Sequence, residues 1–272
     1  MNFPRILKKR KGYIDRIKPF MQKSVAKVLT GQRRVGKSFL LYQLIEEILA
    51  EEPDANIIYV NLEDFTFSSL QTAEDLHSYI ISHSKEKVKN YIFIDEIQDI
   101  PGFEKVIRSL LLNEDNDIYI TGSNAKMLSG ELATYLSGRY IEFKIYSLSY
   151  SEFLEFHGLT ESETSYELYS RYGGLPYLLN LPLEDETVNE YLKSVYSTIV
   201  FRDVVSRYKL RNTLFLEKLI QFLSENIGNL FSAKNISDYL KSQHTAISVN
   251  QIQSYTEYLN NAFLIHRVDR QD

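Results

Sequence analysis

Five short apolar segments alternate with amphipathic stretches in the first half of the chain. The apolar segments are residues 24–30, 57–60, 91–94, 118–121 and 141–146. Between them, apolar residues recur at helical spacing, notably over residues 38–49 and 103–112. Short strands that are apolar on both faces and alternate with helices are typical of a parallel sheet covered on both sides. The pattern therefore predicts an α/β core.

The second half of the chain has a helical pattern. Helices are predicted over 149–156, 162–172 and 183–209, with a break at residues 173–176, then over 216–226, 233–241 and 249–260 before a closing strand at 263–268. Three short helices and a strand suggest a winged helix, although any small helical cap would show the same periodicity. We therefore predict an α/β core over 1–148, a helical lid over 149–212 and a small winged-helix-like domain over 213–272.

Composition removes several classes of protein. The 272 residues include no cysteine and only five histidines, which excludes disulfides and thiolate chemistry and argues against a zinc site. No run of about 18 apolar residues is present, and no apolar segment follows the basic N-terminus. Neither a membrane span nor a secretory signal is predicted, so we expect a cytoplasmic protein.

Charge is distributed unevenly along the chain. The net charge is −5, yet Asp15 is the only acid before Lys37, in a segment rich in lysine and arginine. Such a segment can contact an anion or a nucleic acid, but more often it is the solvated face of a helix. The solvated face is the favoured interpretation.

The segment Gly31-Gln32-Arg33-Arg34-Val35-Gly36-Lys37-Ser38 matches the P-loop pattern G-x-x-x-x-G-K-[ST]. It follows a predicted strand and opens a predicted helix, where backbone N–H groups and the helix N-terminus surround an anion. Lys37 is expected to reach the β- and γ-phosphates, and the Ser38 hydroxyl to bind Mg²⁺. The remaining nucleotide contacts are assigned to neighbouring positions of this segment: Gly31, Arg34, Val35, Gly36 and Phe39.

Two acidic residues end the third predicted strand. Asp95 follows the apolar run YIFI and is placed to hold Mg²⁺, while Glu96 can act as the general base on the attacking water. Because a P-loop kinase must keep water away from the phosphate, this pair favours hydrolysis over transfer to a metabolite.

Polar residues near the last two strands complete the candidate site. Ser123 or Asn124, after the fourth strand, can contact the γ-phosphate or the lytic water, and the sequence does not decide between them. Arg139 precedes the fifth strand, where an arginine can reach a neighbouring subunit's nucleotide and stabilise transition-state charge in trans.

Five motifs together, TGQRRVGKS, YIFIDEIQDI, IYITGSNAKMLSGE, LATYLSGRYIEFKIYSLSYSEFL and RYGGLPYLL, resemble the archaeal and bacterial AAA-type P-loop ATPases. The resemblance implies an AAA+ core with a helical lid and a winged-helix region. It makes Asn124 a sensor candidate and Arg139 the arginine finger. It places Pro176 in a lid turn against the adenine, with Arg171 as a candidate lid sensor.

The resemblance also shows a departure. Relatives usually continue into a nuclease-like domain, whereas this chain stops at residues 268–272, where a wing is expected. The sequence is therefore expected to be short or truncated, and a nuclease activity is not carried over.

DNA binding is the less favoured role for the winged-helix region. The candidate recognition helix, 249–260, contains no lysine or arginine, which is poor for phosphate contact. Basic residues around it could supply some charge: Lys234, Lys241, His244, Arg267 and Arg270.

The favoured function is Mg-ATP hydrolysis that changes the arrangement of lid and winged helix, with self-association through Arg139. The alternative is a nucleotide-gated interaction module that hydrolyses slowly. The guanine-specific NKxD motif is absent from the sequence, which favours ATP over GTP. The biological partner and the oligomeric state are left open.

Overall fold

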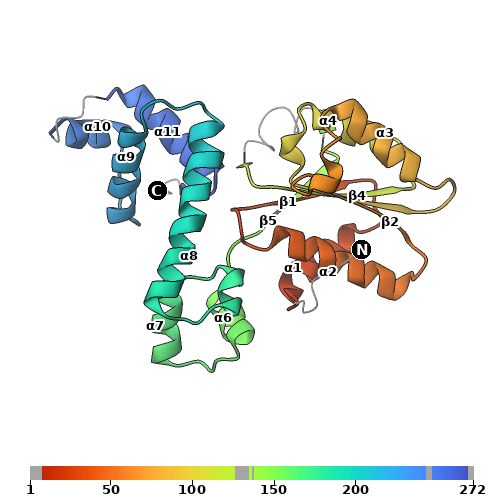
Figure 1. Ribbon diagram of the computed structural model, residues 1–272, viewed down its shortest axis with the longest axis horizontal. Helices are drawn as coiled ribbons and strands as arrows, with labels where there is room; N and C mark the ends of the chain where they lie inside the picture. The colour runs from red at the N-terminus through yellow and green to blue at the C-terminus, as the bar shows by residue number, and fades with distance from the viewer. Residues whose placement is uncertain (1–7, 126–134, 137, 243–246, 269–272) are drawn as a thin grey trace. The chain divides into compact units, whose positions relative to one another are not determined.

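The computed structural model describes residues 8–125, 135–136, 138–242 and 247–268 (Figure 1). The chain divides into two compact units, Met1–Tyr191 and Leu192–Asp272. The first contains the sheet and the start of the lid, and the second contains helices. The predicted division into three parts, at 148 and 212, stays a prediction.

A five-stranded parallel sheet forms the centre of the first unit. Its strands are β1 (Ala26–Thr30), β2 (Asn56–Asn61), β3 (Asn90–Asp95), β4 (Asn116–Gly122) and β5 (Tyr140–Lys144), in the order β2-β3-β4-β1-β5. Every pairing between neighbouring strands is parallel. The predicted α/β fold with a parallel sheet is confirmed.

Helices cover both faces of the sheet (Figure 1). On one face lie α3 (Ala73–His83) and α4 (Phe103–Leu110), over a core that includes Val28, Ile94 and Ile120. On the other lie α1 (Lys11–Ile17) and α2 (Lys37–Glu51), over a second core. Each residue of β1, β3 and β4 is buried, because these strands are covered on both faces.

Strand order determines where a ligand can bind. The connection that leaves β1 runs past β4 and β3 to reach β2. The connection that leaves β4 runs past β1 to reach β5, in the opposite direction, so the direction of winding switches beside β1. In open parallel sheets, ligands bind at the carboxyl ends of the strands at such a switch point. The loop after β1 and the acids that end β3 therefore lie at the same edge.

A small helical subdomain follows β5. It comprises α6 (Tyr150–His157), α7 (Glu163–Tyr172), the 3₁₀ turn η5 (Pro176–Asn180) and the start of α8 (Asp185–Thr198). Ser149 begins α6 with a capping box that includes Glu152. Leu148, Phe153 and Phe156 form a core of their own. The helix predicted over 183–209 is instead α8 followed by a π-helical segment, η6 (Ile199–Ser206).

Shorter 3₁₀ segments complete the first unit. They are η1 (Lys18–Phe20), η2 (Phe65–Phe67) and η3 (Ile97–Asp99). The last of these directly follows the acidic pair at the end of β3.

The second unit contains α9 (Thr213–Glu225), α10 (Ala233–Ser242) and α11 (Val249–Asn261), close to the three predicted helices. The predicted strand at 263–268 is wrong, because Phe263 has a left-handed φ of 55° and the Leu264 N–H still donates to the Leu259 carbonyl of α11. The described part of this unit also holds no strand with which it could pair. The winged helix stays a prediction, and His244, Arg270 and residues 269–272 lie outside the described residues.

Among the helices of the described residues, none combines the length and the apolar character that spanning a bilayer requires.

Candidate nucleotide-binding site

The loop between β1 and α2 is shaped by two glycines. Gly31 has a φ of 153°, and a Cβ there would lie 2.2 Å from the Ile145 carbonyl oxygen, so a side chain does not fit. Gly36 has a φ of 93° and precedes the first residue of α2, and no side chain among the described residues caps this helix. The exposed N–H groups and the helix dipole at such a terminus attract an anion.

Lys37 places its ammonium inside this loop. Its Nζ donates to the carbonyl oxygens of Gly31 and Gln32, at 3.1 Å each, and lies 3.5 Å from Glu96 Oε1. Only 4% of the side chain is exposed. A cation therefore lies at the centre of the loop, beside the acidic pair of β3.

Asp95 is buried at the end of β3 and surrounded by hydroxyl groups. It accepts hydrogen bonds from Ser38 and Thr121, and Tyr59 OH donates to Asp95 Oδ2 at 3.4 Å. Burial raises the pKa of Asp95, and the hydrogen bonds from Ser38 and Thr121 partly offset this. The Ser38 hydroxyl and the Asp95 carboxylate are oxygen donors of the kind that Mg²⁺ prefers, so this pair fits a magnesium ion.

Glu96 adopts an unusual backbone conformation. Its φ and ψ are 56° and 45°, in the left-handed region, and its N–H donates to Thr121 Oγ1 at 3.0 Å. Gln98 Nε2 donates to Glu96 Oε2 at 2.6 Å. Burial by itself would raise the pKa of Glu96, but Lys37, the hydrogen bond from Gln98 and Arg33 leave it below its ordinary value. The carboxylate is therefore ionised at neutral pH, as a general base must be.

The remaining predicted residues of the first unit differ in their distance from this centre. Ser123 and Asn124 are buried directly after β4, two and three residues beyond Thr121.

The other predicted residues lie at the loop itself. Pro176 lies beside the loop, since its Cγ is 3.7 Å from the position that a Cβ of Gly36 would take. Arg34 and Phe39 belong to the loop and the first turn of α2, and both are exposed.

Two predicted arginines lie elsewhere. The Arg139 carbonyl accepts a hydrogen bond from the N–H of Ala26, at 2.9 Å, at the amino end of β1. It is therefore at the opposite end of the strand from the P-loop, and its side chain is exposed. Arg171 forms an ion pair with Asp185 on the lid. The structure thus does not bring Arg139 to the loop of its own chain.

Sequence reasoning missed three contributors to the site. Thr121 links Asp95 to the backbone of Glu96, Gln98 holds the Glu96 carboxylate, and Arg33 Nη1 forms an ion pair with Glu63 Oε1 at 3.0 Å. A polar residue ending the apolar run IYIT was a signal for Thr121. Arg33 and Gln98 lie within the P-loop segment and the motif YIFIDEIQDI, but no sequence pattern indicated their partners, which are set by the loop and by the turn after β3.

Comparison with known proteins agrees with this geometry. Residues 23–154 match the family model described as an AAA domain. The chain belongs to the AAA family of P-loop ATPases. Its residues 163–271 match a second model, a domain of unknown function (DUF8612).

Relatives of the whole AAA chain are found in a bacterium and an archaeon. An uncharacterized protein of Haemophilus influenzae is 37% identical over 97% of this chain and 67% of its own length. The uncharacterized protein MJ1544 of Methanocaldococcus jannaschii is 33% identical over 88% of this chain. This chain spans 55% of the length of the archaeal relative.

Solved structures show more distant similarity. The Orc1 protein of Aeropyrum pernix in complex with DNA is 15% identical, with 95% of this chain and 85% of that chain covered and a TM-score of 0.46. Domain III of the Thermotoga maritima replication initiation protein DnaA is 13% identical, with 64% and 82% covered and a TM-score of 0.43. Likenesses at this level are too distant to bear on function.

Proposed function

We propose that this AAA chain binds Mg-ATP at the loop after β1 and hydrolyses it. The observation that supports this most directly is the contact between loop and acidic pair: Lys37 lies 3.5 Å from Glu96, and Ser38 donates to Asp95. A lysine ammonium, a pair of oxygen donors and a carboxylate thus occupy one edge of the sheet. This combination is what phosphoryl transfer to water requires.

Each residue has a separate role in the proposed reaction. The N–H groups of the loop and Lys37 bind the β- and γ-phosphates. Ser38 and Asp95 would hold Mg²⁺, whose charge would neutralise that of the phosphate oxygens. Glu96 accepts a proton from the attacking water as the bond from phosphorus to the leaving ADP oxygen breaks. Ser123 or Asn124 orients that water or contacts the γ-phosphate.

The location of Arg139 supports a requirement for a second copy of the chain. An exposed arginine at the amino end of the sheet cannot serve its own loop, but it is free to enter the site of a neighbour. In that role Arg139 would stabilise the charge that develops on the phosphate. Nucleotide-driven movement of the lid is the proposed output, with the lid turn at Pro176 next to the nucleotide.

Steady-state ATP turnover tests the proposal. We expect Glu96→Gln to lower the turnover rate by about 10²–10⁴-fold while ATP still binds, because the general base is removed and the site keeps its shape. Glu114→Gln is the matched control, since Glu114 is exposed in the turn that precedes β4 at the other end of the sheet. Unchanged turnover in Glu96→Gln would refute the assigned base.

The role of Arg139 is tested in the same assay. Inactive Arg139→Ala chains and inactive Glu96→Gln chains are mixed, so that one supplies an intact site and the other an intact arginine. We expect activity to return on mixing and to increase with protein concentration. Mixtures that stay inactive, or a wild-type rate per chain that does not depend on concentration, would exclude action in trans.

One observation favours a second candidate function, a module that hydrolyses ATP slowly and signals by its bound state. Both carboxylate oxygens of Glu96 have partners, Lys37 and Gln98, and its lowered pKa makes it a weaker base. Slow basal hydrolysis is the expected consequence. A burst of ADP formation followed by slow steady-state turnover would support this candidate, whereas rapid multiple turnover by the chain alone would reject it.

A further inference from the structure

Arg10 is a buried arginine within the basic N-terminal segment. It precedes α1, and only 3% of its side chain is exposed, whereas 46% of the side chain of its neighbour Lys9 is exposed. A buried guanidinium must find acceptors for its N–H groups, because an unpaired buried charge is costly. Arg10 therefore does not belong to the solvated face that the charge pattern favours.

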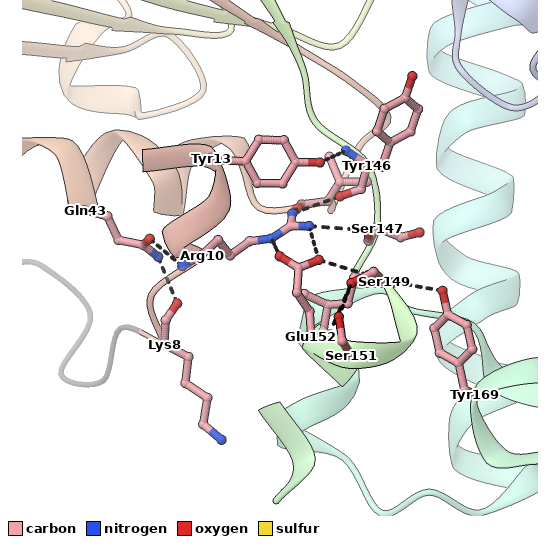
Figure 2. A network of polar contacts seen from close by, with 12 residues as sticks. Lys8, Arg10, Tyr13, Gln43, Tyr146, Ser147, Ser149, Ser151, Glu152 and Tyr169 are labelled. Carbon is pink, nitrogen blue, oxygen red and sulfur yellow. Dashed lines mark hydrogen bonds and ion pairs between the residues drawn. The ribbon is translucent and has the colours of Figure 1, made fainter. Parts of the chain in front are cut away.

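The guanidinium of Arg10 makes five hydrogen bonds (Figure 2). Nε and Nη2 donate to the two carboxylate oxygens of Glu152, at 2.8 Å each. Nη1 donates to the carbonyl oxygens of Tyr146, at 2.8 Å, and Val35, at 3.2 Å. Nη2 also donates to the Ser147 carbonyl at 3.4 Å. These acceptors come from three separate parts of the first unit.

The three parts are those that a nucleotide-dependent movement would involve. Val35 is the residue before Gly36 in the P-loop, while Tyr146 and Ser147 form the connection from β5 to the lid. Glu152 lies in the first turn of α6, the first lid helix. One planar side chain thus contacts the phosphate loop, the connection and the lid simultaneously.

Neighbouring contacts fix the position of Arg10. Its N–H donates to Gln43 Oε1 at 3.0 Å, and Gln43 Nε2 donates to the Lys8 carbonyl at 2.9 Å, which attaches the segment to α2. The guanidinium carbon lies 4.5 Å from the centroid of the Tyr13 ring. Tyr13 OH accepts a hydrogen bond from the N–H of Tyr146 at 3.1 Å (Figure 2). The backbone of Arg10 is therefore attached to α2, and its guanidinium packs against Tyr13.

Glu152 has two functions at the lid end of this network. Besides binding Arg10, its Oε2 accepts the Ser149 N–H at 2.9 Å, as part of the box that begins α6. A change in the Arg10–Glu152 distance would therefore also change the first turn of the lid helix. Burial by itself would raise the pKa of Glu152, but the bonds from Arg10 and Ser149 leave it below its ordinary value.

We propose that Arg10 is a positioning residue that couples the P-loop to the lid, so that nucleotide in the loop sets the orientation of α6. This inference rests on the proposed function, because it requires nucleotide at the loop. A ligand can shift the lid only if the loop contacts differ between the bound and free states. The Val35 carbonyl is the loop group through which such a difference would reach Arg10, and the bidentate pair with Glu152 would pass it to α6.

The geometry requires an arginine. Lysine has one ammonium on a flexible stem and cannot span two carboxylate oxygens and the carbonyls of Val35 and Tyr146 in one plane. Arg10→Lys keeps the charge but loses most of these bonds. Glu152→Gln has the opposite effect, since glutamine still fits the capping box at this position while the ion pair is lost.

The test combines nucleotide affinity with a distance measurement. Because the chain contains no cysteine, spin labels attach only to cysteines introduced at the exposed positions Lys105, on α4, and Ser170, on α7. The distance distribution between the labels is measured with and without a non-hydrolysable ATP analogue and Mg²⁺. Lys9→Gln is the matched control, because it removes an exposed ion pair one residue away.

We expect wild type and Lys9→Gln to bind the analogue equally and to show the same shift in label distance. Arg10→Gln is expected to bind about tenfold more weakly and to lose the shift, with Arg10→Lys intermediate. Glu152→Gln is expected to lose the shift with a smaller loss of affinity, because the contact with Val35 remains. If Arg10→Gln does not fold, Arg10→Lys and Glu152→Gln decide the question.

Three outcomes would contradict the inference. Folded Arg10→Gln with wild-type affinity and a wild-type shift would overturn it. A shift retained in both Arg10→Lys and Glu152→Gln would do the same. A wild-type chain that does not bind the analogue would overturn the proposed function as well, which separates the two failures.

Discussion

The two ends of the sheet each contain a buried pair of a lysine and a carboxylate, and the two pairs differ in their surroundings. At the amino end, Lys27 and Asp117 form an ion pair with 0% of either side chain exposed. At the carboxyl end, Lys37 and Glu96 lie 3.5 Å apart with 4% and 9% exposed. The two pairs are thus buried to a similar extent. They differ in their backbone conformations and in their other hydrogen bonds.

Protein groups bind both members of the amino-end pair. Lys27 Nζ also donates to the Val25 carbonyl at 2.9 Å, and Asp117 Oδ2 accepts from Gln22 N–H and Tyr119 OH at 2.8 Å each. Both residues lie in regular strands. Burial lowers the pKa of Lys27, and the attraction to Asp117 only partly offsets this. Removing both charges of such a pair from water costs free energy, which their mutual attraction offsets.

The carboxyl-end pair has a different environment. Glu96 itself has a left-handed backbone with a φ of 56°, and so do Arg34 and Gly36 in the loop, at 68° and 93°. At the amino end neither Lys27 nor Asp117 does, although Gln22, which donates to Asp117, has a φ of 58°. Gln98 Oε1 is buried and has no hydrogen-bond partner among the described residues. Strained backbones and unsatisfied polar atoms cluster where a protein binds or reacts with a ligand. The comparison shows that local geometry, more than burial, separates a structural ion pair from a candidate active site.

The same substitution at both ends should give the largest contrast. We expect Lys27→Met to lower the free energy of unfolding by about 3–5 kcal/mol, because Asp117 loses its buried cation. Lys37→Met should cost much less stability, since Arg33 still acts on Glu96, but it should remove the stabilisation that ATP gives to wild type. Urea unfolding with and without Mg-ATP measures both effects.

A double variant isolates the amino-end pair. Lys27→Met/Asp117→Leu should recover most of the lost stability, because no unpaired charge remains. If Lys37→Met unfolds the chain as readily as Lys27→Met does, the contrast between the two ends is wrong.

The Arg10–Glu152 pair is partly exposed, with 24% of the Glu152 side chain accessible to solvent. Its contribution to stability should depend on pH, which sharpens the comparison between the two buried pairs. Folding lowers the pKa of Glu152 from its ordinary value of 4.5. The ionised carboxylate therefore stabilises the fold fully above pH 4.5, and this stabilisation is lost as the pH falls through the pKa of the folded state. Glu152→Gln should therefore be less stable by about 1.5–3 kcal/mol at pH 7.

Urea titrations of both proteins between neutral and acidic pH measure this difference. It should shrink steadily below pH 4.5. A difference that is constant with pH would mean that packing, and not charge, accounts for the effect of Glu152→Gln.

The exposed pair between Lys9 and Glu47 should give the smallest effect. Its side chains are 46% and 21% exposed, and Glu47 has a second partner in Lys18. Lys9→Gln should change the free energy of unfolding by no more than about 0.5 kcal/mol, because water and salt screen exposed pairs. Thermal unfolding at low and high salt tests this. A larger loss at low salt would show that this pair fixes the N-terminal segment.

Local sequence patterns predicted the regular elements of the core well. All five strands lie within about two residues of their predicted positions, because short continuous runs of β-branched and aromatic residues give a signal that tertiary packing reinforces. The strand at 263–268 failed for a related reason. Its apolar residues are consistent with a strand, but a strand forms only where another strand can pair with it.

The P-loop, the acid pair and the strands that carry them were determined by the sequence itself, because glycine, lysine and strand-end acids act through the backbone a few residues away. Only the tertiary structure decided that Arg10 binds Glu152 and Val35, 142 and 25 residues away. It likewise decided that Arg139 pairs with the amino end of β1, through its carbonyl and the N–H of Ala26. Hydrogen bonds between distant segments depend on how the chain packs, and periodicity along the sequence does not record that packing.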